Sequence, residues 1–283
     1  MTTDQKQLIK ATVPVLKKSG LLLTTHFYRR VFAGNPELQN IFNQGNQQNG
    51  RQPAALAMAV LAYAENIDDP SVLLPTVTRI GHKHTSLDIR PEHYAVIGRH
   101  LIASISEVLG DAATPALLDA WTAAYGQLAS LMIGIEAGMY AAQADKPGGW
   151  TGWRPFVVRT KVVESDGITS FYLYPADGGP VADHGPGQYL SIRLFIPQLN
   201  LLQPRQYRLA DAPNGLYYRI AVKRDGGEVV SPNELISNRL CDVVQEGDHL
   251  DVSAPAGVCA AAIKLDKPVV LKRGGGCPMH QTL

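Results

Sequence analysis

The sequence predicts an all-α domain, an antiparallel six-stranded β-barrel after it, and the first strand of a further α/β domain at the C-terminal end. Three observations support this fold class. The 283 residues suffice for about two domains. Helix-start signals recur through residues 1–145, and short β-branched and aromatic runs replace them after the glycine-containing sequence 145–149. We therefore expect domains over residues 1–145 and 151–260, and an incomplete one over 261–283.

Composition narrows the class of protein. The chain is 45% hydrophobic and 18% charged, which indicates a folded globular protein with a sizeable core. Lysine and arginine total 26 against 25 acidic residues, and this balance offers no basic surface for a nucleic acid. No apolar run approaches the roughly 20 residues of a membrane span, and the N-terminus lacks a signal-peptide core. Three widely spaced cysteines favour a reducing compartment. We expect a cytoplasmic monomer.

The helical part is marked by starts in which proline follows a capping residue, the order typical of a first helical turn. These starts are Asn35-Pro36, Asp69-Pro70, Arg90-Pro91 and Thr114-Pro115, although arginine is a poor cap. An apolar stripe then continues over residues 116–140, which predicts a long helix through the middle of a bundle.

The second part alternates short apolar runs with turn sequences. The clearest runs cover residues 156–158, 168–174, 189–196 and 217–222, and Asp-Gly or Asn-Gly pairs lie between them. About six strands at this spacing predict a small antiparallel barrel. One helix interrupts the strands, because residues 231–234 read Ser-Pro-Asn-Glu, a capping box with proline at the first helical position.

Periodicity alone assigns no chemistry to the helical part. His82 and His84 lie two apart, so only one of them can face a helix core, and a capping or surface histidine is the simpler interpretation of His84. Tyr28 and Phe32, like Gln52 and Leu56, are four apart and share a helix face. For any one of these residues taken singly, a core aromatic or an exposed glutamine is the simpler interpretation.

A resemblance in the order of the sequence motifs favours a functional role for these residues. The segments His26-Phe27-Tyr28, Asn35-Pro36-Glu37-Leu38, Ile41-Phe42-Asn43 and Lys83-His84 resemble the globin half of the flavohaemoglobins. The resemblance implies a haem b whose iron is held by His84. It implies a distal pocket with Tyr28, Gln52 and Leu56, a phenylalanine wedged against the haem at Phe42, and partners of the proximal imidazole at Tyr94 and Glu136.

The second part resembles the flavin-binding barrel of the ferredoxin–NADP reductases in its flavohaemoglobin form. The motifs are Gly-Pro-Gly-Gln-Tyr at 185–189, Arg-Gln-Tyr-Arg at 205–208 and the capped helix after Ser231. The resemblance implies FAD held by Tyr189, Arg205, Gln206, Tyr207, Arg208 and Ser231. Two departures predict weaker flavin binding: Arg208 replaces a serine of the family, and Glu234 puts a carboxylate near the expected phosphate.

The C-terminal residues predict the start of a dinucleotide-binding domain. An apolar run at 268–271 is followed by Gly274, Gly275 and Gly276, the pattern that opens the nicotinamide-binding domain in the reductase family. No second strand or crossover helix follows in the 283 residues. We expect the reductase part to be incomplete.

The resemblance implies a nitric oxide dioxygenase. In that family NAD(P)H reduces FAD, electrons pass to haem, and haem-bound oxygen oxidises nitric oxide to nitrate, so the small-molecule partners would be oxygen, nitric oxide and NAD(P)H. A carboxylate behind the proximal histidine favours oxygen activation, and a distal tyrosine stabilises negative charge on the ligand. Two alternatives remain: a haem protein that only binds oxygen, nitric oxide or lipid, and a fragment without function.

Overall fold

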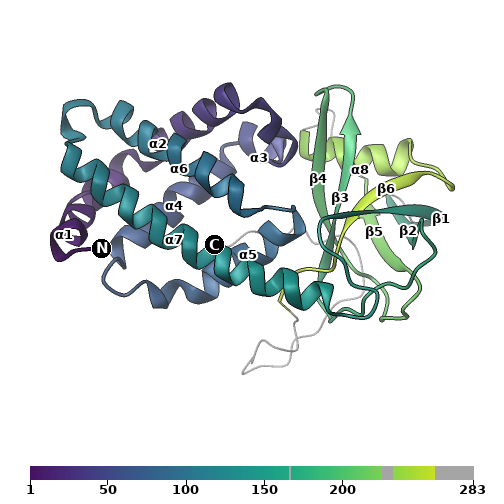
Figure 1. The fold of residues 1–283 in the computed structure, drawn as a ribbon. Helices are drawn as coiled ribbons and strands as arrows, with labels where there is room; N and C mark the ends of the chain where they lie inside the picture. Colours follow the sequence, from purple (N-terminus) through teal and green to yellow (C-terminus); the bar gives the residue numbers. More distant parts are fainter. Residues whose placement is uncertain (166, 225–231, 259–283) are drawn as a thin grey trace.

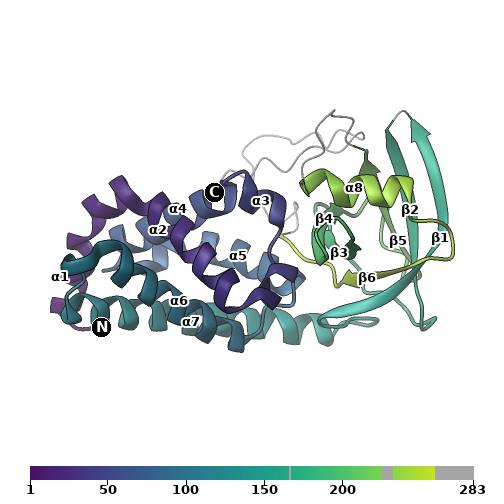
Figure 2. The same ribbon diagram turned by 90° about the horizontal axis from the view of Figure 1, so that it is seen from above.

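The computed structural model describes residues 1–165, 167–224 and 232–258. It places a bundle of helices at one end and a sheet at the other, with α7 running along the bundle toward the sheet (Figures 1 and 2). Ser231, the three glycines at 274–276 and the expected domain start at 261–283 lie outside the described residues.

The helical part begins its elements at the predicted prolines. Pro36 and Pro70 open single 3₁₀ turns, whereas Pro91 and Pro115 open long α-helices. Arg90 is compensated as a cap, because its backbone N–H donates to His93 Nδ1 at 2.8 Å. The helices are α1 Thr3–Ala11, α2 Val13–Gly34, α3 Gln44–Gln48, α4 Arg51–Glu65, α5 Leu74–Ser86, α6 Pro91–Leu109 and α7 Pro115–Ala144, with 3₁₀ turns η1 Pro36–Asn40, η2 Pro70–Leu73 and η3 Gly110–Ala112.

The core of the bundle lies where α2, α6 and α7 meet. Phe27 and Val31 from α2, Ile105 from α6 and Trp121 from α7 are each at most 3% exposed. Burial of such side chains contributes about 1.5–3 kcal/mol each. The amphipathic stripes of the long helices therefore account for the stability of this part.

Six strands form one antiparallel sheet, as the fold class predicts. They are β1 Trp153–Ser165, β2 Ile168–Pro175, β3 Tyr189–Ile196, β4 Leu201–Arg208, β5 Tyr218–Lys223 and β6 His249–Ser253, in the order β4-β3-β6-β1-β2-β5. A further bridge between Leu209 and Ile220 joins the two ends of this order, which makes the sheet a barrel. Helix α8, Pro232–Asp242, packs on it through Ile236 and Leu240.

Strands β4 and β6 are absent from the apolar runs of the sequence. Strand β4 carries Pro204 in its interior. The proline is tolerated because the described strand pairing on the outer side of β4 is the single bridge at Leu209, so Pro204 needs no ladder bond there. Its residues pair with β3 throughout, from Tyr189 opposite Arg208 to Ile196 opposite Leu201.

The connection between the two parts is short, and its central glycine approaches another backbone segment closely. It spans the eight residues from Asp145 to Gly152, and Gly148 has a φ of +68°. A side chain at Gly148 would place its Cβ 2.8 Å from the backbone carbon of Pro180. No helix among the described ranges is long and apolar enough to cross a membrane.

Candidate functional site

Two side chains from two other helices converge behind the imidazole of His84. His84 lies in the last turn of α5, and its Nδ1 is 2.8 Å from Glu136 Oε1 on α7 and 3.0 Å from the Tyr94 hydroxyl on α6. The Tyr94 hydroxyl donates to the same carboxylate oxygen at 2.6 Å. Glu136 therefore accepts two hydrogen bonds, one from the ring and one from the phenol.

Burial strengthens the electrostatic interactions among His84, Tyr94 and Glu136. The Glu136 side chain is 4% exposed, whereas that of His84 is 31% exposed. Burial raises the pKa of Tyr94, and the neighbouring Glu136 carboxylate raises it further, so the phenol keeps its proton and remains a donor. A buried carboxylate with two donors holds the imidazole with its Nδ1–H toward Glu136.

The other ring nitrogen of His84 is available to a metal. Among the described residues Nε2 has no hydrogen-bond partner, and the Nδ1 contact fixes the tautomer in which Nε2 carries a free electron pair. This donor set fits a haem iron, which takes one neutral imidazole and is tuned by the hydrogen bond on its far side.

Two more tyrosines hold together the helices that carry Tyr94 and Glu136. The Tyr125 hydroxyl donates to the Tyr94 carbonyl at 2.6 Å, and the Tyr140 hydroxyl donates to the Ile89 carbonyl at 2.7 Å. Gly98 makes room for Tyr125, because a Cβ there would lie 2.5 Å from the ring. Both hydrogen bonds connect α7 to the start of α6 or to the residues just before it. Neither bond has a signal in the sequence.

The predicted distal residues form an aromatic cluster. Tyr28 is 7% exposed, and its ring centroid lies 5.9 Å from Phe32 and 5.6 Å from Phe42. Burial raises the pKa of Tyr28, while the nearby side-chain amides of Gln52 and Gln47 act in the opposite direction. The hydroxyl is therefore neutral at physiological pH and can donate a proton in a hydrogen bond.

The distal cluster also contains polar atoms without partners. Gln52 Oε1 and Gln47 Nε2 are buried, and neither has a hydrogen-bond partner within the described part of the chain. Buried amide atoms left unpaired cost free energy, which a bound polar ligand would recover. Leu56, one turn from Gln52, packs against the same core and keeps the surroundings apolar. Gln47 was missed by sequence reasoning, because a glutamine in the Gln- and Asn-rich segment 44–49 carries no periodic signal.

The predicted flavin residues lie on the paired strands β3 and β4. Tyr189 faces Arg208, Ser191 faces Gln206, and each pair shares one side of the sheet. Burial raises the pKa of Tyr189 to about 12. Gly257, with a φ of +100°, lies against this ring, and a Cβ there would be 2.8 Å from Tyr189 Cε1.

Arg205 supplies the observation that fits an anionic cofactor. Its Nη1 is buried and has no partner among the residues that the structure describes. A buried guanidinium nitrogen with no acceptor is suited to a phosphate oxygen. Tyr207, two residues further along β4, is 7% exposed, and its hydroxyl is 3.2 Å from Ser237 Oγ of α8. Arg208 is exposed, so its guanidinium extends into solvent and not into the barrel.

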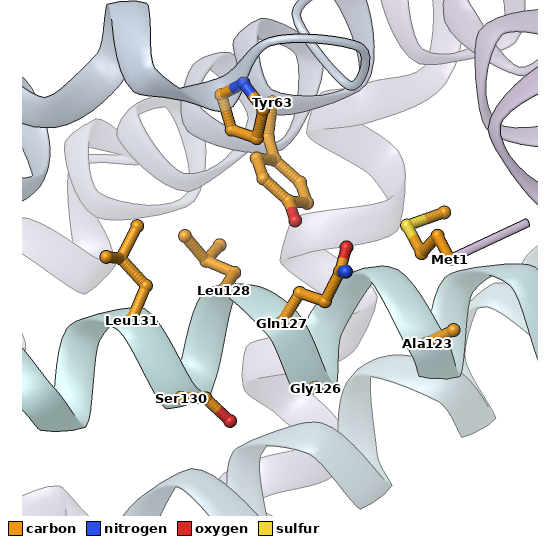
Figure 3. A pocket seen from close by; sticks show the side chains of 9 residues that line it. Met1, Tyr63, Ala123, Gly126, Gln127, Leu128, Ser130 and Leu131 are labelled. Carbon is orange, nitrogen blue, oxygen red and sulfur yellow. The ribbon is translucent and has the colours of Figure 1, made fainter.

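A separate cavity of about 610 Å³ lies along α7. Tyr63, Gln127, Leu128 and Leu131 line it together with Met1, as Figure 3 shows. None of the predicted site residues takes part in its lining. The Tyr63 hydroxyl is already engaged, since it donates to the Ala124 carbonyl at 3.0 Å.

Comparison with known proteins shows which family this chain resembles. Residues 25–132 match the family model Globin. A flavohemoprotein of Bordetella parapertussis is 57% identical over 277 residues, which are 97% of this chain and 68% of that protein. A flavohemoprotein of Bacillus subtilis is 46% identical over 95% of this chain and 65% of its own length.

A solved structure agrees with the arrangement of both parts. The flavohemoglobin of Malassezia yamatoensis, determined with bound FAD and heme, superimposes with a TM-score of 0.78 at 29% identity. The match covers 91% of this chain and 64% of that chain, so the 283 residues span about two thirds of such relatives. On the strength of the Bordetella match over nearly the whole sequence, the chain belongs to the flavohemoprotein family.

Proposed function

We propose that the protein is a haem- and FAD-binding oxidoreductase that converts nitric oxide to nitrate. When bound, haem supplies an iron that takes up oxygen, and FAD supplies single electrons drawn from NAD(P)H. The overall change is balanced, since nitric oxide, oxygen and one electron give nitrate. The observation that carries this proposal is the hydrogen-bonded set of His84, Glu136 and Tyr94.

The proximal residues would tune the iron through the imidazole. His84 would be the metal ligand through Nε2, because Nδ1 is committed to the carboxylate. Glu136 makes the ring a stronger electron donor by accepting its Nδ1–H, and this favours activation of oxygen over its simple carriage. Tyr94 holds the carboxylate in place by donating to the same oxygen, Glu136 Oε1.

The distal residues would bind and orient the gas ligands. The neutral Tyr28 hydroxyl can donate to a ligand that gains negative charge, with the Gln52 amide beside it. Phe42 and Leu56 exclude water from that side. A pocket with one or two polar groups on apolar walls suits diatomic molecules.

The barrel residues would hold FAD. Arg205 would pair with a phosphate, and Tyr189 on β3 and Tyr207 on β4 would line the ring system. Gln206 would hold these two strands together through its bond to Ser191. The unpaired Arg205 nitrogen supports this assignment. Ser231 and Gly274–Gly276 complete the family's cofactor residues in sequence, at positions that the structure does not describe.

Absorption spectroscopy of the purified chain tests the cofactors, and a cavity variant tests the ligand. We expect both haem and flavin bands. His84→Gly should lose stable haem, and added imidazole should restore the haem spectrum by filling the vacated ligand position. His82→Ala, two residues away on α5, is the matched control and should keep its haem. A normal haem spectrum in His84→Gly without imidazole would exclude His84 as the ligand.

Nitric oxide consumption separates the dioxygenase from a binding protein. With both cofactors bound, the chain should consume nitric oxide in the presence of oxygen when a chemical reductant supplies electrons. Consumption with NADH alone would extend the proposal to hydride transfer from the nicotinamide. Binding of oxygen and nitric oxide without nitrate formation would instead identify a gas-binding protein.

A further inference from the structure

A pair of buried serine hydroxyls joins the helical part to the barrel. Ser86 is the last residue of α5 and is 1% exposed, and Ser191 lies in β3 and is fully buried. Ser191 Oγ donates to Ser86 Oγ at 2.9 Å across 105 residues of sequence. Two hydroxyls hidden from water at a junction between two parts must satisfy each other, which makes the contact specific in position.

The pair belongs to a chain of hydrogen bonds that runs in one direction. Gln206 Nε2 donates to Ser191 Oγ at 3.1 Å, Ser191 donates to Ser86, and Ser86 Oγ donates to the Lys83 carbonyl at 2.8 Å. Each hydroxyl therefore accepts one bond and donates the next, an arrangement in which neighbouring bonds strengthen one another. The Ser191 backbone N–H is fixed separately by Ser253 Oγ at 2.8 Å.

The ends of this chain lie in the two candidate cofactor sites. Lys83 directly precedes His84, and its carbonyl belongs to the last turn of α5. Gln206 lies between Arg205 and Tyr207 on β4. Four consecutive polar groups thus connect the backbone beside the proposed iron ligand to the strand proposed to hold flavin.

We propose that Ser86 and Ser191 are positioning residues that fix the last turn of α5 against strands β3 and β4, and thereby set the rate of electron transfer from flavin to haem. The proposal rests on the proposed function. In the step concerned, one electron leaves the reduced flavin and converts ferric to ferrous haem iron. A slip between the parts would leave a buried hydroxyl unsatisfied, so the hydrogen-bond chain restricts the cofactors to one separation and orientation.

The test uses Ser86→Ala, Ser191→Ala and the double variant, all loaded with both cofactors. Flavin is reduced by light with EDTA as the electron donor, so no nicotinamide is needed, and haem reduction is followed by absorbance. Each single variant should transfer electrons about two- to tenfold more slowly, as expected for one lost hydrogen bond. The double variant should be no slower than the single ones, because both serines act through one contact.

Controls separate positioning from general damage. Ser104→Ala removes a fully buried hydroxyl from α6, inside the helical part, and should leave the transfer rate unchanged. Ser86→Thr keeps the hydroxyl and should retain a rate near that of the parent. The iron–histidine stretching frequency in resonance Raman spectra should shift in Ser86→Ala and not in Ser104→Ala.

A second measurement needs no cofactor. Hydrogen exchange of the unloaded chain should become faster in Ser86→Ala both in the last turn of α5 and in β3, since the two are held by the same bond. A chain that takes up neither haem nor flavin would refute the proposed function and with it the electron-transfer role. Two cofactors with an unchanged transfer rate in Ser86→Ala, or additive slowing in the double variant, would overturn this inference alone.

Discussion

At the scale of single residues, the role of the Glu136 carboxylate depends on the hydrogen-bond donors around it. Its carboxylate is almost fully buried, and it accepts bonds from His84 and Tyr94. Such a burial is costly without donors, so the two donors and the carboxylate form one unit. Sequence spacing could not reveal this unit, because its members lie 10 and 42 residues apart on three helices.

Tyr28→Phe tests the distal hydroxyl. Removal of this donor should speed oxygen dissociation from the ferrous haem protein by roughly 5- to 150-fold, as expected for a lost hydrogen bond of about 1–3 kcal/mol. Stopped-flow replacement of oxygen by carbon monoxide measures the rate. Tyr63→Phe, which removes a buried hydroxyl bonded to the Ala124 carbonyl, is the control and should leave it unchanged. An unchanged rate in Tyr28→Phe would place this hydroxyl away from the ligand.

Arg208→Ser tests the departure from the family's flavin motif. Arg208 lies opposite Tyr189 and is exposed. The family resemblance implies a serine here that would donate a hydrogen bond to the flavin. The serine variant should bind FAD about two- to tenfold more tightly, the value of one regained hydrogen bond. Quenching of FAD fluorescence gives the dissociation constant. Arg159→Ser removes another exposed arginine of the barrel and should have no effect; equal affinity in both variants would contradict the expectation.

At the scale of elements, β4 connects the barrel to the segment that carries Phe42. Gln203 of β4 is 2% exposed, its Oε1 accepts from the Gln44 backbone N–H at 2.9 Å, and its Nε2 donates to the Gln39 carbonyl at 3.0 Å. Asn40 Oδ1 accepts from the Leu202 backbone N–H at 2.8 Å. The edge of the sheet is thereby covered by η1 and α3, which also protects its unpaired backbone groups.

Gln203→Ala should loosen this contact from both sides. It leaves the Gln44 N–H and the Gln39 carbonyl without their partner, so the free energy of unfolding should fall by about 1–3 kcal/mol. Haem should also dissociate faster, because Phe42 follows η1. Urea denaturation and haem transfer to apomyoglobin measure the two effects. Gln245→Ala, an exposed glutamine of the barrel, serves as the control, and equal stability of the two variants would speak against the contact.

Elements with periodic or capping signals could be predicted from the sequence, and contacts between the parts could not. The proline starts at Pro91 and Pro115 and the run at 189–196 have strong local causes, and the structure confirms them. Strand β4 has no alternation and contains a proline, so its pairing depends on β3 alone. Ser86, Ser191 and Gln203 are isolated polar residues, and only the folded chain gives them partners.

At the scale of the whole molecule, the partly buried histidines His82, His100 and His184 make stability depend on pH, because burial lowers the pKa of each. Burial lowers the pKa of His100, and the charges of Arg30 and Arg99 lower it further; burial also lowers that of His184, against weaker effects of Gly185 and Asp183. The folded state therefore binds these protons less readily than the unfolded chain, whose histidines titrate near 6.5. Their contribution is complete above this pH and is lost as the pH falls below it.

Urea denaturation at about pH 7.5 and about pH 5.5 measures this dependence. The denaturation midpoint of the parent chain should fall on acidification. His100→Gln removes one of these three histidines and should lose less stability over the same interval, while the position can still bond to Asn35, whose Oδ1 lies 3.0 Å from the imidazole Nε2. The same loss in His100→Gln as in the parent would show that this histidine does not contribute.

The glycines of the junction have a mechanical consequence for the molecule. Gly148 lies against the backbone of Pro180, and Gly149 lies against the Gln143 carbonyl at the end of α7, with no room for a side chain at either position. Together with the hydrogen bonds of Ser86 and Gln203, these two glycines hold the helical part and the barrel in one fixed relative orientation. Because neither glycine has room for a side chain, an inserted residue at 148–149 would misalign both ends of the connection at once, whereas the exposed residues 145–147 and 151 stay open to a protease.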